Sequence, residues 1–310
     1  MDGSAKRPAA VVEAALWSLG TLVAISLIAI AGREGARHVP TLEIMFHRGW
    51  MGVAMVVGVA ALGPGVRSLG TGRLGLHAWR NAVHFTAQFS WFWALTQIPL
   101  AQVFTLEFSL PLWLALLAPL VLGERLTVAR LVAVAIGFAG TLLVLRPSMA
   151  GINLGAAAAL YSAIGYAFSV MAVKQLMRTD SALCVLFWMS LLQCVYGLVL
   201  LQGAPSWPAP VALTWIAAIA VCGLTAHFCM ARAFALADTL IVAPMDYLRL
   251  PLIAVVGLLA YDEPLDAMVL VGGLVIAAAN IGNLLAERRR VSSADGDAQH
   301  HRARSMIRQK

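Results

Sequence analysis

The chain has 310 residues, of which 61% are hydrophobic and only 12% carry a charge. Soluble domains contain about 25% Asp, Glu, Lys and Arg, so soluble enzymes, secreted disulfide scaffolds and disordered chains are all disfavoured. The net charge of +7 does not indicate nucleic-acid binding, because Lys and Arg in the loops of a membrane protein serve to orient its helices.

This composition predicts an all-α polytopic membrane protein, and ten apolar segments are long enough to be its transmembrane helices. A helix needs about 20 apolar residues to cross the hydrocarbon core. Most of the intervening loops are short and contain Gly or Pro, so neighbouring helices should run antiparallel. In chain order the ten segments are residues 14–32, 42–62, 76–96, 100–122, 127–145, 152–173, 182–202, 211–235, 240–261 and 266–286.

The first segment has a second interpretation as a cleaved signal peptide. It follows a basic pair and ends in Ala29-Ile30-Ala31, which is similar to a signal-peptidase site. However, the apolar run from Ala14 to Ala31 is longer than the roughly 7–15 residues of a signal-peptide core. We therefore expect a retained first helix.

Lys and Arg are distributed unevenly over the two ends of these helices. With a cytoplasmic N-terminus, ten of them fall on the inner side and three on the outer side, and the tail adds more to the inner side. Because cytoplasmic loops carry the excess of Lys and Arg, both termini are expected in the cytoplasm, with the protein in the inner membrane. The inner residues are Lys6, Arg7, Arg67, Arg73, Arg80, Arg125, Arg130, Lys174, Arg178 and Arg232, and the outer ones are Arg33, Arg37 and Arg146.

The two halves of the chain resemble each other weakly. Leu110-Pro111-Leu112 leads to a loop with Glu124, and Leu250-Pro251-Leu252 leads to a loop with Glu263. Five helices per half is an odd number, so the second half must enter the membrane from the opposite side. Chance similarity between apolar helices is the alternative.

The repeat predicts three regions. A first five-helix repeat covers residues 14–145, a second covers residues 152–286, and a basic cytoplasmic tail covers residues 287–310. Inverted repeats of this kind place a shared binding site near the membrane midplane and give two nearly equivalent states.

Several motifs carry a resemblance to a known family. The stretch Ile98-Pro99-Leu100-Ala101 is followed by Pro111-Leu112-Trp113, Leu122-Gly123-Glu124-Arg125-Leu126 and Gly137-Phe138-Ala139-Gly140. Together they resemble the first-repeat signature of the EamA family in the drug/metabolite transporter superfamily. The second half is similar to its degenerate second copy, although Asp262-Glu263-Pro264 replaces the usual Gly-Glu-Arg pattern. The resemblance implies ten helices, a central cavity lined mainly by helices three, four, eight and nine, and export or uptake of small metabolites.

Four charged residues lie deep inside apolar segments: Arg48, Glu107, Asp246 and Arg249. A charge at the centre of a membrane helix costs about 2.5–3.5 kcal/mol on insertion scales, so such residues face a cavity or a partner. Asp246 and Arg249 are three positions apart and can neutralise each other on one helix face. We interpret the four as a site for substrate and protons; a structural ion pair between helices is the alternative.

The third segment carries a polar stripe at steps of three and four residues, which is one face of a helix. Its members are His77, Asn81, His84, Gln88, Trp91 and Leu95. We expect His84, Gln88 and Trp91 to contact a ligand. Interhelical hydrogen bonding is the alternative, since Asn, Gln and His often join membrane helices.

Two further residues complete the predicted site. His227 in the eighth segment is a candidate proton carrier. The nearby Arg232 is explained without any function, because its long side chain can extend to the membrane surface. Tyr247 in the ninth segment could donate a hydrogen bond to a ligand, although Tyr is also common at membrane interfaces. No motif for a metal, a nucleotide or another cofactor is present, and no cofactor is expected.

These observations predict a secondary transporter that works by alternating access and exports a small polar or zwitterionic metabolite, either amino-acid-like or an opine-type metallophore. Arg249 and Arg48 would bind an anionic group, Asp246 and His84 an amine, and Glu107 would bind and release protons. Uptake of a nucleoside- or S-adenosylmethionine-like compound is the alternative. An intramembrane protease is disfavoured because the sequence has none of the catalytic motifs of that class. A purely structural membrane protein would not need charged residues such as Glu107, Asp246 and Arg249 so deep in its helices.

The expected partners are the solute, the lipid bilayer and either protons or a counter-solute, with no nucleic acid. Small residues recur in steps of four, as in Ala133, Gly137 and Thr141 and again in Gly273 and Ala277. Such spacing allows close helix packing, within one subunit or between the subunits of a homodimer.

Overall fold

The computed structural model describes residues 8–122, 127–146, 153–237 and 239–286, and every regular element in these ranges is a helix. The loop motif around Glu124 and the tail at 287–310 lie outside the described residues. The elements are α1 (Pro8–Gly35), α2 (Thr41–Leu62), the short 3-10 helix η1 (Val66–Leu69), α3 (Leu74–Gln97), α4 (Leu100–Glu107), α5 (Leu110–Leu122), α6 (Val128–Leu145), α7 (Leu154–Leu176), α8 (Ala182–Leu200), α9 (Pro210–Leu236), α10 (Thr239–Asp246), α11 (Arg249–Tyr261) and a C-terminal helix, Ala267–Ala286.

Side chains fix where several helices begin. The Oγ1 of Thr127 accepts from Arg130 N before α6, the Oδ1 of Asn153 accepts from Gly155 N before α7, and the Oγ of Ser181 accepts from Cys184 N before α8. Each of these residues satisfies a backbone N–H that has no acceptor inside the first turn. The helices therefore start close to the boundaries that the apolar pattern predicts.

Among the described residues, nine candidate spans are long and apolar enough to cross a membrane. This confirms the predicted all-α polytopic membrane protein. Helix α3 has 24 residues but is not one of the nine, because its polar stripe lowers its hydropathy. The tenth span therefore remains a prediction.

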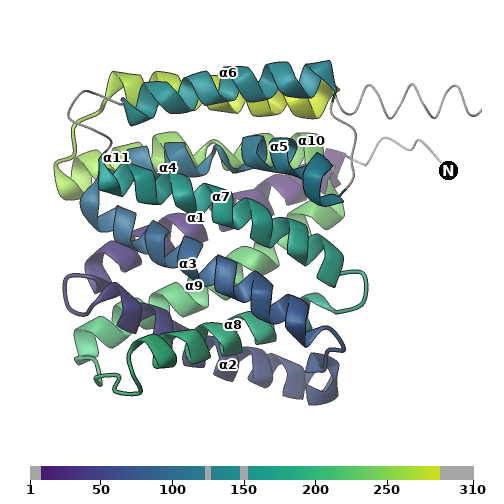
Figure 1. Cartoon of the computed structure of the whole chain (residues 1–310), viewed down its shortest axis with the longest axis vertical. Helices are drawn as coiled ribbons and strands as arrows, with labels where there is room; N and C mark the ends of the chain where they lie inside the picture. The colour runs from purple at the N-terminus through teal and green to yellow at the C-terminus, as the bar shows by residue number, and fades with distance from the viewer. Residues whose placement is uncertain (1–7, 123–126, 147–152, 238, 287–310) are drawn as a thin grey trace, which may run out of the picture.

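The helices lie roughly parallel in successive layers (Figure 1). Helix α6 and the C-terminal helix form one edge of the bundle, and α2 and α8 form the opposite edge. The most extensive contacts join α1 to α9, α3 to α7, and α2 to α8. The first helix of residues 14–145 thus packs on the third helix of residues 152–286, and the reverse pair also packs.

Glycines bring α6 and the C-terminal helix into backbone contact. A Cβ on Gly140 would lie 2.9 Å from the carbonyl oxygen of Gly272, and a Cβ on Gly272 would lie 2.8 Å from that of Gly140. A Cβ on Gly137 would in turn overlap Leu112 of α5. The small residues of these two helices therefore serve packing within one chain.

The largest apolar core gathers at one end of the bundle. It combines the C-terminal parts of α1, α3 and α11 with the N-terminal parts of α2, α4, α7 and α9, and includes the fully buried Phe92, Phe104 and Ile44. Because neighbouring helices run antiparallel, these parts share one end, which we call the closed end. Smaller apolar clusters around Val56 and around Ala233 occupy the opposite end.

Candidate functional site

Both expected membrane acids lie where a helix is interrupted. Glu107 is the last residue of α4, Asp246 is the last residue of α10, and Arg249 is the first residue of α11. The Nη2 of Arg249 is 2.9 Å from the Oδ2 of Asp246 and 3.6 Å from the Oε1 of Glu107. The predicted Asp246–Arg249 pair is confirmed, and the fold adds Glu107 from the other half. We call these three residues the ion network.

Two prolines explain why the interruptions occur there. Pro111 and Pro251 each stand in the first turn of the second short helix, α5 and α11. Proline has no N–H to donate and is tolerated in a first turn, where that N–H would have no acceptor in the helix. The side-chain amide of Asn280 donates to the freed carbonyl of Phe108 at 3.0 Å, so the break in the first half is satisfied by the second.

Aromatic side chains surround the ion network. The indole Nε1 of Trp91 donates to the Oε2 of Glu107 at 2.8 Å. The guanidinium carbon of Arg249 lies 5.0 Å from the ring centre of Phe104 and 5.2 Å from that of Phe108. These cation–π contacts and the two carboxylates hold Arg249 in place.

The three charged side chains differ in their access to solvent. Arg249 is buried, with 3% of its side chain exposed, whereas the side chain of Asp246 is 45% exposed. The Nε and Nη1 of Arg249 are buried and have no hydrogen-bond partner. Asp246 is therefore the most accessible member of the network. Tyr247, the next residue, packs its ring against Phe108 at 4.9 Å.

The polar stripe of α3 faces α7 and α8. His84 Nδ1 is 3.2 Å from Ser169 Oγ, and its ring lies 5.2 Å from that of Tyr166. The amide of Gln193 donates to the Oε1 of Gln88 at 2.9 Å. Gln88 thus makes an interhelical hydrogen bond, which was the alternative to the predicted ligand contact. Trp91 instead contacts the ion network.

A second group of charged side chains was only partly anticipated. Arg80 was counted as an inner-side charge, but it is buried in α3 and its Nη1 donates to Asn81 Oδ1 at 2.7 Å. It lies four residues before His84 on the polar stripe, and this spacing could have identified it. Arg80, Arg48 and His227 are near enough to His84 for their positive charges to disfavour its protonated form. We call Arg48, Arg80, His84 and His227 the basic cluster.

Tyr166 of α7 interacts electrostatically with Glu107 of the ion network and with Arg48 of the basic cluster. Arg48, His84 and Tyr166 lie inside their helices and Glu107 lies at the end of α4, yet all four keep part of their surface exposed. Close packing would bury them completely. Trp91, Glu107, Asp246 and Arg249 thus meet in the ion network, while Arg48, His84 and His227 are related by electrostatic interactions alone.

The closed end has its own ion pair. Arg33 of α1 pairs with Glu263 and donates from Nε to Leu95 O at 2.5 Å and from Nη2 to Ile98 O at 2.6 Å. Glu263 also accepts from the backbone N of Leu100 at 2.9 Å, the first residue of α4. These bonds tie three segments of the chain together at the closed end.

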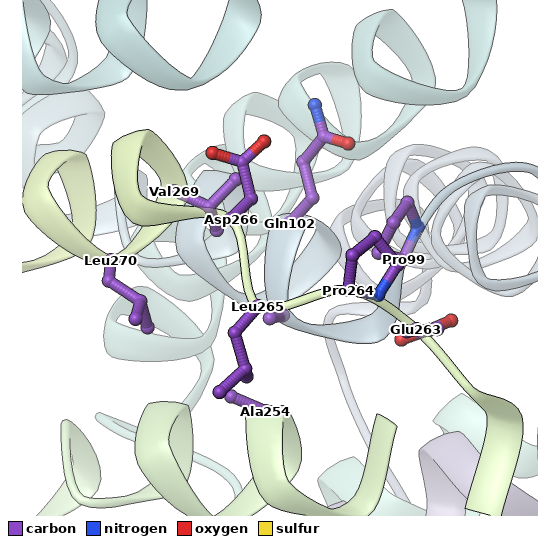
Figure 2. A pocket seen from close by; sticks show the side chains of 10 residues that line it. Pro99, Gln102, Ala254, Glu263, Pro264, Leu265, Asp266, Val269 and Leu270 are labelled. Carbon is purple, nitrogen blue, oxygen red and sulfur yellow. The ribbon is translucent and has the colours of Figure 1, made fainter. Parts of the chain in front are cut away.

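A pocket lies next to this ion pair, between α4, α11 and the start of the C-terminal helix. Figure 2 shows Gln102, Glu263 and Asp266 around it, together with Leu265 and Leu270. None of the predicted site residues lines this pocket. It belongs to the closed end and not to the ion network.

In the described part of the chain, one group of side chains brings three possible metal ligands within 4.8 Å of one another: His77, Asp180 and Cys184. The Oδ2 of Asp180 already accepts from Thr71 Oγ1 at 2.6 Å and lies 2.8 Å from His77 Nε2. Hydrogen bonds from Thr71, and then from His77 and Thr179, lower the pKa of Asp180 below its usual value. We assign this group a structural role, joining the turn before α3 to the turn before α8.

Comparison with known proteins shows which family the chain resembles. Residues 12–146 match the model of the EamA-like transporter family. The S-adenosylmethionine uptake transporter of Rickettsia prowazekii (strain Madrid E) is 24% identical over 277 residues, which cover 89% of this chain and 94% of that protein. The riboflavin transporter of Vibrio cholerae serotype O1 is 30% identical over 202 residues, covering 64% of this chain and 67% of that protein.

Two further similarities span most of the chain. The pseudopaline exporter CntI of Pseudomonas aeruginosa (strain UCBPP-PA14) is 26% identical, covering 80% of this chain and 88% of that protein. A chain in a solved crystal structure has the same fold, with a TM-score of 0.61 at 20% identity, covering 89% of this chain and 98% of that one. The named relatives include both an uptake transporter and an exporter.

Proposed function

The chain belongs to the EamA-like transporter family, and we propose that within it the protein is a secondary carrier for a small zwitterionic metabolite, which it exports by alternating access. Family and relatives indicate a small-molecule transporter and not an enzyme. The finer proposal concerns the solute, the direction and the residues that bind it.

The observation that carries this proposal is the ion network at two interrupted helices. Helix interruptions within the membrane are tolerated where the backbone lines a cavity or is buried in protein, and charges there mark solute or ion paths. Glu107 and Asp246 stand at equivalent breaks, and Arg249 connects them. A zwitterion can exchange with these contacts because it carries both charges.

The arrangement of the helices supports alternating access between two inverted repeats, residues 14–145 and 152–286. The reciprocal contacts of α1 with α9 and of α3 with α7 agree with a two-fold relation between the halves. With both termini in the cytoplasm, the closed end would face outward. The conformation described here would then be sealed outside by the apolar core and by Arg33 with Glu263.

Proton coupling is assigned to Glu107, with His227 as a second carrier. Glu107 contacts both Trp91 and Arg249. Protonation of Glu107 would therefore remove one of the two ion pairs that Arg249 makes. His84, Gln88 and Tyr247 would complete the solute contacts with Trp91. A homodimer remains a prediction.

Uptake of an S-adenosylmethionine-like compound is the second candidate. It is favoured by the Rickettsia relative, whose similarity spans 89% of this chain. Both candidates use the same site. They differ in direction, which in a reversible carrier follows the gradients of the solutes.

The deciding experiment is exchange of labelled solutes in proteoliposomes. We expect exchange of S-adenosylmethionine or of an amino acid such as histidine, and none of an uncharged sugar. Arg249→Ala should abolish exchange in folded protein, because it leaves two carboxylates without their partner. Arg232→Ala, which removes a half-exposed arginine paired with Glu13, is the matched control. Normal exchange by Arg249→Ala would refute the assignment of the site.

A further inference from the structure

We infer that Glu263 and Asn280 are positioning residues for Glu107, because they hold the two ends of α4 and thereby keep Glu107 at its place in the ion network. The importance of Glu107 for transport rests on the proposed function, but its positioning can be tested without any solute. Both holding residues lie in the second half of the chain, whereas α4 lies in the first.

Helix α4 is too short to fix its own orientation. It contains eight residues, which is about two turns and about 12 Å of rise, so it presents little surface for packing. Its direction therefore depends on what holds its two ends. A tilt that moved its last residue, Glu107, by about 1 Å would break the hydrogen bond from Trp91, which spans 2.8 Å.

Glu263 holds the beginning of α4. The residue before the helix is Pro99, whose side chain makes no cap hydrogen bond, although the first N–H groups of a helix have no acceptor within it. The Oε2 of Glu263 accepts from one of them, the N of Leu100, at 2.9 Å. A carboxylate at this end is also favoured by the helix dipole.

A glycine in α11 gives this carboxylate the room that it needs. A Cβ on Gly257 would lie 2.5 Å from the Oε2 of Glu263, so a side chain there would push the carboxylate away. The other oxygen of Glu263 pairs with Arg33 of α1. The carboxylate is thus placed between α1, α11 and the first residue of α4.

Asn280 holds the other end of α4. It is buried, with 8% of the residue exposed, and its amide donates to Phe108 O at 3.0 Å. Phe108 directly follows Glu107, and its ring centre lies 5.2 Å from the guanidinium carbon of Arg249. This hydrogen bond therefore fixes both the backbone beside Glu107 and the ring that covers Arg249.

The surface that carries Asn280 is itself packed. The ring of Phe108 belongs to an apolar cluster that joins α5, α11 and the C-terminal helix, with Leu112, Leu250, Ile276 and Ala279 as its other buried members. Asn280 follows Ala279 directly, so its amide donates from a helix that is held against the break. The position of Asn280 is thereby passed on to the end of α4.

The first test measures how readily Glu107 reacts with a hydrophobic carbodiimide in the purified protein in detergent, by peptide mass spectrometry. Carbodiimides react with protonated, accessible carboxyl groups, and the contacts of Glu107 with Arg249 and Trp91 favour its ionised form. Asn280→Leu removes the donor with little change in side-chain size. It should make the labelling of Glu107 about threefold faster or more, because both contacts weaken when the end of α4 is released.

Two controls separate positioning from general loosening of the fold. Thr141 of α6 is also buried, but its hydroxyl donates at 3.0 Å to a carbonyl of its own helix, so Thr141→Val should leave the labelling of Glu107 unchanged. Glu43 of α2 is a buried acid bonded to the loop before α9, and its labelling should not change in Asn280→Leu. Equal increases at Glu43 and Glu107, or no increase at Glu107, would overturn the role of Asn280.

The second test compares two variants at the opposite end of α4. Glu263→Gln and Glu263→Leu both remove the ion pair with Arg33, but only glutamine keeps a side-chain oxygen that can accept from Leu100 N. We expect labelling of Glu107 to stay near the wild-type rate in Glu263→Gln and to be about threefold faster in Glu263→Leu. Equal rates in the two variants would show that the bond to Leu100 does not position Glu107.

The two proposals fail in different ways. Faster labelling of Glu107 in Asn280→Leu and Glu263→Leu, with no exchange of any solute by the wild type in proteoliposomes, would support the positioning and contradict the transport proposal. Exchange by the wild type, with labelling of Glu107 unchanged in both variants, would support transport and contradict the positioning.

Discussion

At the scale of single residues, Arg249 shows how much a local pattern can indicate. Its pairing with Asp246 follows from a separation of three residues on one helix face, and the 2.9 Å contact confirms it. Its second partner, Glu107, comes from the other half of the chain. No sequence spacing predicts that contact, because it depends on how α4 and α11 pack together.

Glu107→Gln tests the proposed proton coupling. The amide keeps the size of the side chain and can still accept the hydrogen bond from Trp91, but it carries no charge that protons could change. We expect solute accumulation driven by a pH gradient to be lost, while solute exchange at equal pH persists. Glu13→Gln, at a half-exposed surface position, serves as control. Gradient-driven accumulation by Glu107→Gln at the wild-type level would exclude this residue as the coupling group.

Asp180 predicts a pH dependence of stability. Its hydrogen bonds, first from Thr71, lower its pKa in the folded protein. A lowered carboxyl pKa stabilises the fold above the unfolded value of about 3.9, and this contribution disappears as the pH falls through the folded pKa. The unfolding temperature between pH 6 and pH 3 should therefore drop less steeply in Asp180→Asn.

The matched control for this change is Asp262→Asn, because Asp262 is an exposed acid in a loop. It should keep the wild-type slope of unfolding temperature against pH. Equal slopes for the wild type and Asp180→Asn would show that the Thr71–His77–Asp180 hydrogen bonds do not contribute to acid stability.

At the scale of secondary structure, the interrupted helices are where the structure adds most to the apolar pattern. Residues 100–122 and 240–261 were each predicted as one segment, but the structure divides them into α4 with α5 and α10 with α11, with Pro111 and Pro251 in the first turn of the second helix. The prolines could not indicate that the last residue before each break is a charged member of one network. Helix α3 illustrates a different case, since its polar stripe weakened its apolar signal while marking the face that contacts α7 and α8.

Gly272→Ala tests the close packing of α6 on the C-terminal helix. The new Cβ would lie 2.8 Å from the backbone oxygen of Gly140, which cannot move aside as a flexible side chain can. Overpacking of this kind costs about 1–3 kcal/mol. Gly282→Ala in the same helix meets nothing within 4 Å and should be neutral or slightly stabilising. Thermal unfolding in detergent compares the two, and an equally stable Gly272→Ala would contradict the contact.

At the scale of the whole molecule, the apolar core is unevenly distributed. It fills the closed end, where Arg33 and Glu263 also pair, and leaves the opposite half with smaller clusters. A carrier with two access states needs one end to pack while the other opens. The uneven core is therefore consistent with one of these two states.

Loop labelling tests the orientation of the molecule. Ala204 follows α8 and Gly72 precedes α3, and both are exposed. With the four native cysteines replaced by alanine, a membrane-impermeant thiol reagent added to intact cells should label Ala204→Cys and not Gly72→Cys. The reverse result would place the closed end in the cytoplasm and invert the proposed access state.

The sequence by itself determined the class of this protein, the approximate helix boundaries and the presence of charges inside the membrane. These features depend on hydrophobic length, on proline and glycine, and on residue type, all of which are local. It also supplied the family resemblance, which residues 12–146 bear out.

Only the tertiary structure decided which of these charges meet and which stay unpaired. Glu107 reaches Arg249, Arg33 reaches Glu263, and Arg80 turns inward with no carboxylate partner among the residues that the structure describes. Such contacts arise when helices distant in sequence pack side by side, and their energies depend on burial and on a few ångströms of separation. For side chains on different helices, residue spacing along the chain contains no information about either quantity.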